Sequence, residues 1–379
     1  MTRKTFKSIL ACLFLSFSIC GCSSEDEIST NGNNGGEQTP VTHFSGTWVT
    51  NVGSPVLFSK AAIEKCVATC KEYHISNIFM CVLNKGRTLY PSKVMKDVTG
   101  IEQMEDLAGR DPLKEMIEAA HKSGIKVHAW LEYGFAAAHG KLGEILERHP
   151  TWASKDQAGN ILVRNNFYWM NPFMPEVQDF MSSLVAEIVK NYDIDGIQGD
   201  DRMPALPSEG GYDEYTVNLY KAEHNGTPPP LNTKDEAWIE WRCNKLSQYM
   251  ARLYQEVKAI RATVIVSSAP GIYPWGKKEY LQDWPKWLKD GYLDYVIPQV
   301  YRTDIAQYRS TLTQQANAVQ GDLKKKVYVG LMIKNDTYTP SEAFLKSMIE
   351  ANRSNSITGE CFWYYDGLQA NDAFFKTYQ

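Results

Sequence analysis

From residue 44 onward, short runs of β-forming residues alternate regularly with amphipathic helical patterns. This alternation is typical of βα units, in which parallel strands lie side by side and helices cover them. The predicted strands span residues 46–52, 77–83, 125–132, 195–199, 264–268, 295–301, 327–333 and 359–364. The predicted helices span residues 60–73, 113–123, 175–192, 238–260, 284–291, 305–319 and 341–352, with a short one from residue 372.

Eight strand–helix units predict an α/β fold, a (β/α)8 TIM barrel, formed by residues 43–379 as a single domain with long βα loops. The alternative is a doubly wound open sheet. Such sheets usually carry a Gly-rich phosphate-binding turn after the first strand, and none stands there. Two connections are unusually long, residues 133–171 and 202–234. Loops of this length usually carry function when they lie at the mouth of a barrel.

The first 21 residues have the pattern of an export signal. A basic start is followed by an apolar run from residue 9 to 19, which is too short for a bilayer that takes roughly 20 apolar residues to cross. The run ends in Ile19-Cys20-Gly21-Cys22, which resembles the lipobox of bacterial lipoproteins. Residues 1–21 are therefore predicted to be a lipoprotein signal peptide, and Cys22 is predicted to be the lipidated residue.

Residues 22–42 contain almost no apolar side chains and are predicted to form a flexible polar tether. These features predict a cell-envelope protein, an outer-membrane lipoprotein that is periplasmic or surface-exposed. The full chain has 40 Lys and Arg against 44 Asp and Glu, and its basic residues form no cluster that could follow a phosphate backbone. Nucleic acid is therefore not an expected partner, whereas a membrane is, through the N-terminal lipid.

The stretch from Asp195 to Asp201 is a short buried strand that runs directly into two carboxylates. Residues alternate sides along a strand, so Ile197 is expected to face the apolar packing side and Asp200 the opposite side. Barrel enzymes place their catalytic groups at the carboxyl ends of the strands. A simpler interpretation is that the two aspartates cap the next helix or pair with Arg202. The alternation predicts Asp200 as the pocket residue.

Other predicted strand ends supply carboxylates and aromatic side chains, and Glu132 has the parity to enter the same pocket. Hydrolysis of a glycosidic bond needs one carboxylic acid and a second carboxylate. A sugar also needs flat aromatic faces and amide or Arg donors. The candidate catalytic residues are Asp200, Asp201, Glu132 and Asp283. The candidate substrate-binding residues are His128, Trp130, Arg87, Asn84, Gln299, Tyr301, Tyr273, Trp275 and Trp363.

Signals for other chemistry are weak. No His-x-His or His-Glu-x-x-His motif is present, and the scattered cysteines beyond residue 22 supply no obvious metal-binding set. Ser267 and Ser268 do not stand in a Gly-x-Ser-x-Gly nucleophile motif. The sequence therefore predicts neither a metal nor a cofactor. A metal-dependent deacetylase is an alternative that would require metal in the purified protein.

Several stretches resemble the glycosyl-hydrolase-like 10 family of bacterial barrel proteins, which is related to the amylase-type glycosidases. The resemblance covers most of residues 47–367 and implies a (β/α)8 glycoside hydrolase that acts on bacterial glycans, including peptidoglycan strands stripped of peptide. The stretches are Trp48-Val49-Thr50-Asn51, Val127-His128-Ala129-Trp130, Asp195-Gly196-Ile197 with Asp200-Asp201, Gly211-Tyr212-Asp213, Gln282-Asp283-Trp284 and Asp294-Tyr295-Val296-Ile297-Pro298-Gln299-Val300-Tyr301.

The spacing Asp-Gly-x-x-x-Asp is also similar to the fourth-strand motif of amylase-type enzymes, whose final Asp is the nucleophile. The resemblance therefore implies that role for Asp200. The chain departs from the family where Arg202 replaces the common Tyr and Glu132 replaces the usual Asn. The general acid is left open among Glu132, Asp201 and Asp283.

The sequence as a whole predicts a glycoside hydrolase that cleaves O-glycosidic bonds in a poly- or oligosaccharide, either a bacterial cell-wall glycan or a dietary or host glycan. Its expected partners are this carbohydrate and the membrane. The alternative is a non-catalytic glycan-binding surface lipoprotein on a degenerate barrel, which the departures at Arg202 and Glu132 would allow. The two differ in whether new reducing ends appear.

Overall fold

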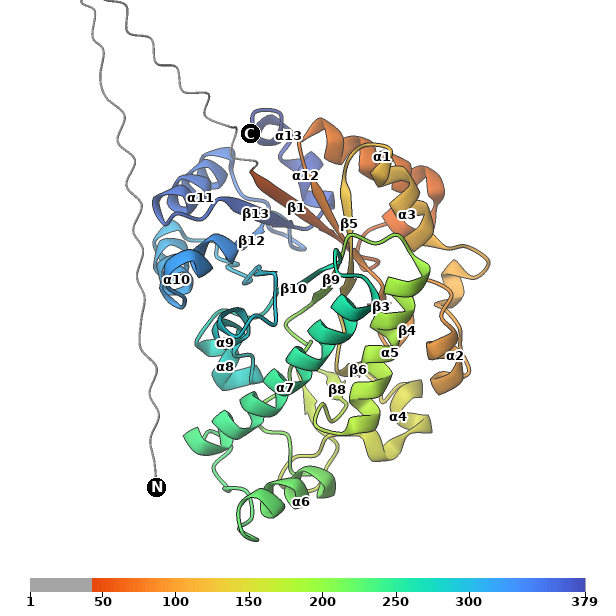
Figure 1. Cartoon of the computed structure of the whole chain (residues 1–379). Helices are drawn as coiled ribbons and strands as arrows, with labels where there is room; N and C mark the ends of the chain where they lie inside the picture. Colours follow the sequence, from red (N-terminus) through yellow and green to blue (C-terminus); the bar gives the residue numbers. More distant parts are fainter. Residues whose placement is uncertain (1–42, 379) are drawn as a thin grey trace, which may run out of the picture. The chain divides into compact units, whose positions relative to one another are not determined.

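A computed structural model describes residues 43–378 of the protein (Figure 1). The predicted signal peptide, Cys22 and the predicted tether lie outside the described residues. The described chain contains eight parallel strands in one sheet, in the order β11-β10-β9-β5-β2-β1-β13-β12. These strands are β1 (Phe44–Val49), β2 (Asn77–Cys81), β5 (Lys126–Leu131), β9 (Gly196–Gly199), β10 (Ile265–Ser268), β11 (Tyr295–Val296), β12 (Val329–Met332) and β13 (Gly359–Trp363).

The sheet closes into a barrel between its two outer strands. Parallel bridges join Val296 to Val327 and Gln299 to Gly330, so the chain around β11 pairs with the chain around β12. Closure of a sheet on itself removes the unpaired edges that an open sheet would expose. The predicted (β/α)8 barrel is confirmed, and each of the eight predicted strands has a counterpart in the structure.

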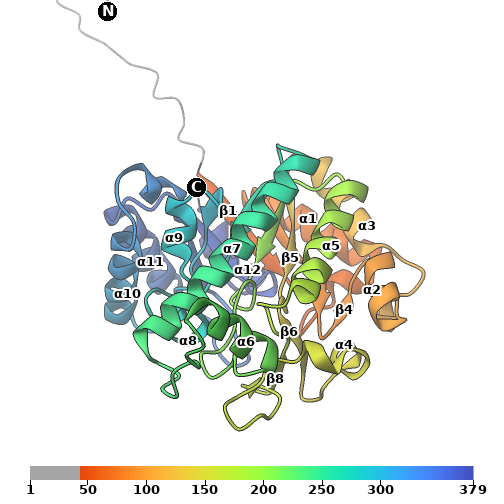
Figure 2. The ribbon, with the colours of Figure 1, turned by 60° about the horizontal axis from the view of Figure 1, so that its bottom comes forward.

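Helices surround the strands, as Figures 1 and 2 show. Helix α3 illustrates why they form: Asp111 accepts a hydrogen bond from the backbone N–H of Lys114 at its N-terminus, and Leu113, Met116 and Ile117 are buried on one face. The main outer helices are α1 (Lys60–Glu72), α3 (Pro112–His121), α5 (Pro175–Asn191), α7 (Glu236–Ile260), α9 (Trp284–Lys289), α10 (Ile305–Asn317), α11 (Glu342–Ser354), α12 (Asp366–Ala370) and α13 (Asp372–Phe375).

The two long loops have structure of their own. The first forms an antiparallel three-stranded sheet in the order β6-β8-β7, and the second contains α6; β8 and α6 lie at the same end of the barrel (Figures 1 and 2). The elements of the loops are β6 (Ala136–His139), α4 (Glu144–Arg148), β7 (Val163–Arg164), β8 (Phe167–Trp169) and α6 (Glu214–Glu223). Further short elements are β3 (Leu83–Asn84), β4 (Arg87–Thr88), α2 (Lys93–Thr99) and α8 (Trp275–Tyr280).

The two faces of β9 differ in polarity. Ile197 is buried in the apolar core, as its parity on β9 predicts. The adjacent Gln198 is also buried, and it accepts a hydrogen bond from Nε1 of Trp48 at 2.8 Å and donates one to Oγ of Ser267 at 3.3 Å. A buried amide stabilises a fold only when it is hydrogen-bonded in this way. The face of β9 that points into the barrel is therefore polar where the strand approaches Asp200.

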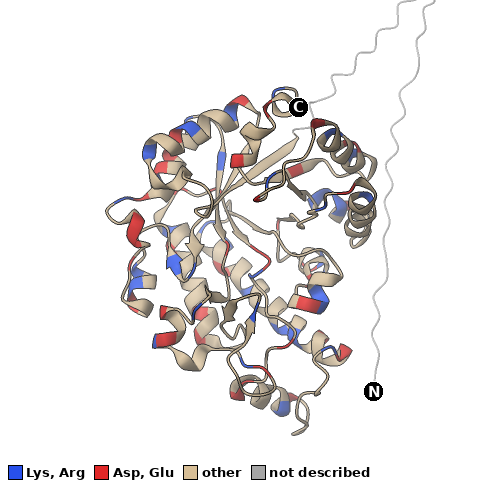
Figure 3. Cartoon of the chain, turned by 180° about the vertical axis from the view of Figure 1, so that it is seen from behind, with Lys and Arg blue, Asp and Glu red and all other residues tan. Residues whose placement is uncertain are grey.

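The described part of the surface carries mixed charge. On the face seen in Figure 3, acidic and basic residues are interspersed along the outer helices. Within residues 43–378, no helix combines the length and the apolar character needed to cross a membrane.

Candidate active site

Asp200 lies at the carboxyl end of β9 and is held from several directions. It is only 3% exposed. Its Oδ1 accepts a hydrogen bond from Nε2 of Gln299 at 2.8 Å, and its Oδ2 accepts one from Nη2 of Arg202 at 2.9 Å. Its backbone carbonyl accepts a third, from Nε2 of Gln282 at 3.0 Å. Asp200 is therefore fixed in one orientation, with both carboxylate oxygens bound to donors.

Glu132 follows the neighbouring strand β5, whose Leu131 is paired in register with Gly199 of β9. This register brings Glu132 beside Asp200. Oε2 of Glu132 accepts a hydrogen bond from Nδ2 of Asn84 at 2.6 Å and from Sγ of Cys81 at 3.4 Å. Its Oε1 lies 3.7 Å from Nη2 of Arg202 and accepts no hydrogen bond from any described residue.

Arg202 binds all three carboxylates of the cluster. Besides Asp200 and Glu132 it contacts Asp201, with Nη1 to Oδ1 at 2.9 Å, and its Nε donates to the backbone carbonyl of Glu132 at 2.9 Å. The guanidinium lies over the ring of Phe167, 4.9 Å from its centroid. The pairing of Arg202 with the two aspartates, which the sequence offered as the simpler interpretation, is thus part of the same cluster as Glu132.

Burial controls the protonation of this cluster. Burial raises the pKa of Asp200 well above its usual value; the charge of Asp201 adds to the rise, and Arg202 opposes it. Burial also raises the pKa of Glu132, against the lowering by Arg202 and by the hydrogen bond from Asn84. For Arg202, burial would lower the pKa, but the three carboxylates together raise it. Two adjacent carboxyls of raised pKa beside a charged Arg202 hold a shared proton more readily than exposed carboxyls would.

A cavity of about 170 Å³, called here the inner cavity, opens over these carboxyls. Three tryptophans wall it, with centroid separations of 6.5 Å for Trp48 and Trp130, 6.1 Å for Trp48 and Trp363, and 5.7 Å for Trp130 and Trp363. The walls combine flat apolar faces with acids and amides, as a sugar ring requires. The lining residues are Trp48, Trp130, Glu132, Asp200, Asp201, Arg202, Gln299, Tyr301 and Trp363.

A second cavity of about 360 Å³, called here the outer cavity, adjoins the first. Glu132 and Trp363 line both cavities. The outer cavity is lined by Thr50, Val52, Gly53, Asn84, Lys85, Glu132, Tyr133, His139, Phe167, Asn335, Asp336, Trp363 and Tyr364.

The structure brings together most of the residues selected from the sequence. Around the inner cavity lie Asp200, Asp201, Glu132, Trp130, Gln299, Tyr301 and Trp363, while Asn84 lines the outer cavity. Sequence reasoning missed Trp48 as a wall of the cavity, although its place near the end of the first predicted strand was a usable signal. It also treated Arg202 only as a partner of the two aspartates, without its link to Glu132.

Two predicted site residues lie away from the carboxyl cluster and have other partners. Asp283 begins α9 and forms an ion pair with Nζ of Lys277 at 2.7 Å, and it lines neither the inner nor the outer cavity. Arg87 pairs with Oε1 of Glu144 at 2.6 Å and likewise lines neither cavity. Their charges are balanced within the loops, so the structure does not bring Asp283 or Arg87 together with Asp200 and Glu132.

Three further predicted sugar ligands also lie away from the carboxyls. His128 is 0% exposed; it is bonded to Oδ1 of Asn77 at 3.1 Å, and burial lowers its pKa to about 3, so it is a neutral residue of the barrel interior. Tyr273 lines a separate cavity beside α7 and α8. Trp275 is 49% exposed on α8 and lines neither cavity at the carboxyls.

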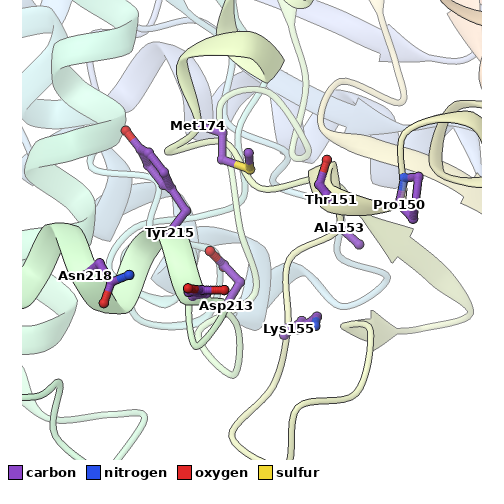
Figure 4. Close-up of a pocket in the computed structure, with 9 residues that line it drawn as sticks. Pro150, Thr151, Ala153, Lys155, Met174, Asp213, Tyr215 and Asn218 are labelled. Atoms are coloured by element: carbon purple, nitrogen blue, oxygen red, sulfur yellow. The ribbon is translucent and has the colours of Figure 1, made fainter.

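A larger cavity of about 550 Å³ lies between the segment that follows α4 and the start of α6, and is called here the lateral cavity (Figure 4). Its carboxylate Asp213 caps α6: Oδ1 accepts from the backbone N–H and the hydroxyl of Thr216, each at 2.9 Å, and from Nδ2 of Asn171 at 2.7 Å. The neighbouring Glu214 belongs to the same helix end, so the two carboxylates do not face each other across a cleft. The lateral cavity is larger than the inner and outer cavities, but its carboxylates are not arranged for catalysis.

The polar groups at the barrel mouth suit acid–base chemistry. Within residues 43–378, no group of three or more His, Cys, Asp or Glu side chains is placed to hold a metal ion. The five cysteines of this part of the chain are buried as free thiols. The carboxyl ends of β5 and β9 present the carboxyls of Glu132, Asp200 and Asp201 around the guanidinium of Arg202.

A closed parallel barrel with buried carboxyls and tryptophans at the carboxyl ends of its strands is the architecture of a barrel glycoside hydrolase. The chain belongs to the Glycosyl hydrolase-like 10 family, whose model matches residues 43–348. The resemblance noted in the sequence is confirmed.

Individual relatives agree with this membership. The protein named glycosyl hydrolase DigH of Escherichia coli strain K12 is 27% identical over 314 residues, which cover 74% of this chain and 68% of that protein. Glycosyl hydrolase YngK of Bacillus subtilis strain 168 is 24% identical over 281 residues, which cover 67% of this chain and 51% of that protein.

Solved structures share the fold. The glycoside hydrolase domain of PgaB (BpsB) from Bordetella bronchiseptica superposes with a TM-score of 0.65 at 13% identity, covering 88% of this chain and 97% of that one. The catalytic domain of the β-amylase from Paenibacillus polymyxa gives a TM-score of 0.63 at 12% identity, with the same two coverages of 88% and 97%. At these identities the likeness concerns the fold alone.

Proposed function

We propose that this protein hydrolyses O-glycosidic bonds in a poly- or oligosaccharide, with peptide-free peptidoglycan strands as the first substrate to test. One observation carries the proposal: the buried Asp200 and the partly buried Glu132 stand side by side at two strand ends, line one cavity and are joined by Arg202. Glycoside hydrolysis requires two such carboxyls, one protonated and one ionised.

The hydrogen bonds support a division of roles between the two carboxyls. Burial raises the pKa of both carboxyls, but both oxygens of Asp200 accept from donors, and these hydrogen bonds favour its ionised form as the nucleophile or base. Oε1 of Glu132 accepts no hydrogen bond from the described chain and is the atom free to carry the proton. Glu132 would then protonate the glycosidic oxygen while the bond from this oxygen to the anomeric carbon breaks. Asp201 supports the pair through Arg202.

The spacing of the carboxyls favours direct attack by Asp200. Oδ2 of Asp200 and Oε1 of Glu132 contact the same nitrogen of Arg202, so their separation cannot exceed the sum of those two contacts, 2.9 and 3.7 Å. Retaining enzymes separate their carboxyls by about 5 Å and inverting enzymes by roughly 6.5–9.5 Å. This upper limit covers the retaining spacing and reaches only the lower edge of the inverting range, so we propose a covalent intermediate on Asp200 and retention of the anomeric configuration.

Removal of the proposed nucleophile tests the function. Peptide-free peptidoglycan strands, together with host and plant glycans, are incubated with the wild type and with Asp200→Asn, and new reducing ends are measured. We expect the variant to lose activity by about 1,000-fold or more, because the oxocarbenium-like transition state loses its anionic partner. The matched control is Asp213→Asn in the lateral cavity, which should retain activity. Near-wild-type turnover by Asp200→Asn would overturn the assignment.

A second candidate is glycan binding without hydrolysis. The observation that favours it is Arg202, which pairs with all three carboxylates in place of the Tyr common in the family. A charge partner of this kind could hold both carboxyls ionised and leave no proton to donate. Retention of the wild type on immobilised glycan strands without new reducing ends would favour this function over hydrolysis.

A further inference from the structure

The inner and outer cavities meet at the proposed acid. Glu132 and Trp363 are the two residues that line both. The two carboxyl oxygens of Glu132 contact residues of different cavities. Its Oε2 accepts a hydrogen bond from Asn84, which lines the outer cavity, and its Oε1 lies near Arg202, which lines the inner cavity. Asp200 lines the inner cavity alone.

This arrangement predicts the direction in which a bound glycan lies across the two cavities. In glycoside hydrolysis the acid protonates the oxygen between the ring under attack and the leaving group. The ring attacked by Asp200 would occupy the inner cavity, and the oxygen would lie at Glu132. Building on the hydrolase function proposed above, we propose that the outer cavity binds the leaving group, that is, the sugar units on the reducing-end side of the cleaved bond.

The walls of the outer cavity fit hydroxyl- and amide-bearing pyranose rings. Tyr133, Phe167 and Tyr364 supply aromatic faces in addition to the shared Trp363. The polar residues Asn335 and Asp336 supply donors and acceptors. Its volume of about 360 Å³ is about twice the 170 Å³ of the inner cavity, so it can hold a longer piece of the glycan than the inner cavity can.

The strand order places the outer cavity toward one side of the barrel mouth. Residues at the ends of β1, β2, β5, β12 and β13 and in the loops after them line the outer cavity, whereas Asp200 and Gln299 of the inner cavity come from the chain at β9 and after β11. In the sheet order, β5, β2, β1, β13 and β12 are consecutive neighbours. The reducing-end side of the glycan therefore lies over this part of the ring.

The cleavage pattern of a labelled oligosaccharide tests the direction. The probe is a peptide-free peptidoglycan hexasaccharide carrying 2-aminopyridine at its reducing end, and the labelled products are separated by length. The wild type is expected to release labelled products of two or more units. Tyr364→Ala removes a wall of the outer cavity alone. It should shift cleavage toward the label and lower kcat/KM about tenfold, the equivalent of 1.4 kcal/mol.

Two further variants make the result specific. Asp336→Ala, also in the outer cavity alone, should shift cleavage in the same direction, and it keeps the test informative if Tyr364→Ala fails to fold. Tyr215→Ala in the lateral cavity is the matched control and should leave the pattern unchanged. Thermal melting checks the fold of each variant.

Each outcome bears on a different claim. Hydrolysis with the same product pattern in both outer-cavity variants, or a shift toward the non-reducing end, would overturn the leaving-group assignment and leave the hydrolase function standing. Failure of the wild type to release reducing ends from any glycan would overturn the proposed function, and the assignment with it. A shift toward the label in both variants, absent in the control, supports the inference.

Discussion

The role of Glu132 depends on a single oxygen, Oε1, which accepts no hydrogen bond from the described residues. If this oxygen protonates the leaving group, Glu132→Gln should lose roughly 100-fold or more of its activity on glycans. The loss should largely disappear on a 2,4-dinitrophenyl glycoside of the same sugar, because dinitrophenolate leaves without a proton. Steady-state rates on the two substrates check this.

The same experiment distinguishes Glu132 from Asp283, another candidate for the general acid. Asp283→Asn changes a carboxylate that is paired with Lys277 outside both cavities, so its activity should stay within a few fold of the wild type. A loss on glycans with rescue by the dinitrophenyl leaving group in Asp283→Asn, and not in Glu132→Gln, would transfer the acid role to Asp283.

The hydrogen bond from Asn84 to Glu132 predicts a shift in the pH profile. Burial raises the pKa of Glu132, and this hydrogen bond opposes the rise by stabilising the ionised form. Asn84→Ala should therefore raise the pKa further. Because activity requires protonated Glu132, the basic limb of the kcat/KM profile should move to higher pH. Asn218→Ala in the lateral cavity is the control; a basic limb that moves to lower pH in Asn84→Ala would contradict the proposed role.

Alternation along the strands predicted which side chains enter the barrel, but not how deep they lie. His128, Trp130 and Glu132 share one side of β5, yet His128 is buried in the interior while Trp130 and Glu132 line the cavity. Each pair of residues along a strand advances about 7 Å, so a residue of correct parity can still lie below the pocket. Parity also says nothing about turn residues such as Arg202, whose position depends on the loop.

At the scale of elements, strand and helix types were predictable where the local pattern was strong. The sixth strand was predicted over residues 295–301 but is regular only over Tyr295–Val296. Pro298 has no N–H to donate, so pairing beyond it continues only as isolated bridges such as that of Gln299 with Gly330. The sheet of β6, β7 and β8 was missed because its strands are short: β7 and β8 form a small local hairpin, and β6 pairs with β8 across a long stretch of sequence, as Ala136 with Trp169.

The second long loop depends on one buried side chain of α7. Arg242 is 0% exposed and donates to the carbonyls of Ser208 at 2.7 Å, Gly210 at 2.8 Å and Thr233 at 2.9 Å. Arg242→Met would leave these acceptors without their donor and should lower the free energy of unfolding by about 3 kcal/mol or more. Urea denaturation measures the change.

A surface arginine of the same helix provides the matched control. Arg252 is partly exposed and pairs with Asp179 and Glu256. Exposed ion pairs contribute little, so Arg252→Met should cost under about 1 kcal/mol. Equal losses in the two variants would mean that Arg242 does not anchor the loop more strongly than a surface pair does.

At the scale of the whole molecule, the count of eight strand–helix units was enough to predict the barrel, because a closed ring satisfies every strand edge. The order of the strands followed from the same count, since consecutive parallel units are neighbours in such a barrel. The cavity system was not predictable at this level: residues that follow five different strands line the outer cavity, and their meeting depends on loop geometry.

The N-terminal segment leads to a prediction about where this barrel works. The sequence Ile19-Cys20-Gly21-Cys22 predicts lipidation at Cys22, and the polar residues 22–42 would separate the lipid from the barrel. We propose that the protein is an envelope lipoprotein. The full chain, expressed in Escherichia coli, should incorporate radiolabelled palmitate and sediment with membranes, whereas Cys22→Ser should do neither. Palmitate incorporation by Cys22→Ser would contradict the assignment.

A chain that begins at residue 43 should melt at the same temperature as the full chain, because residues 22–42 have too few apolar side chains to add to the core. A lower melting temperature of the shortened chain would show that residues before 43 support the barrel.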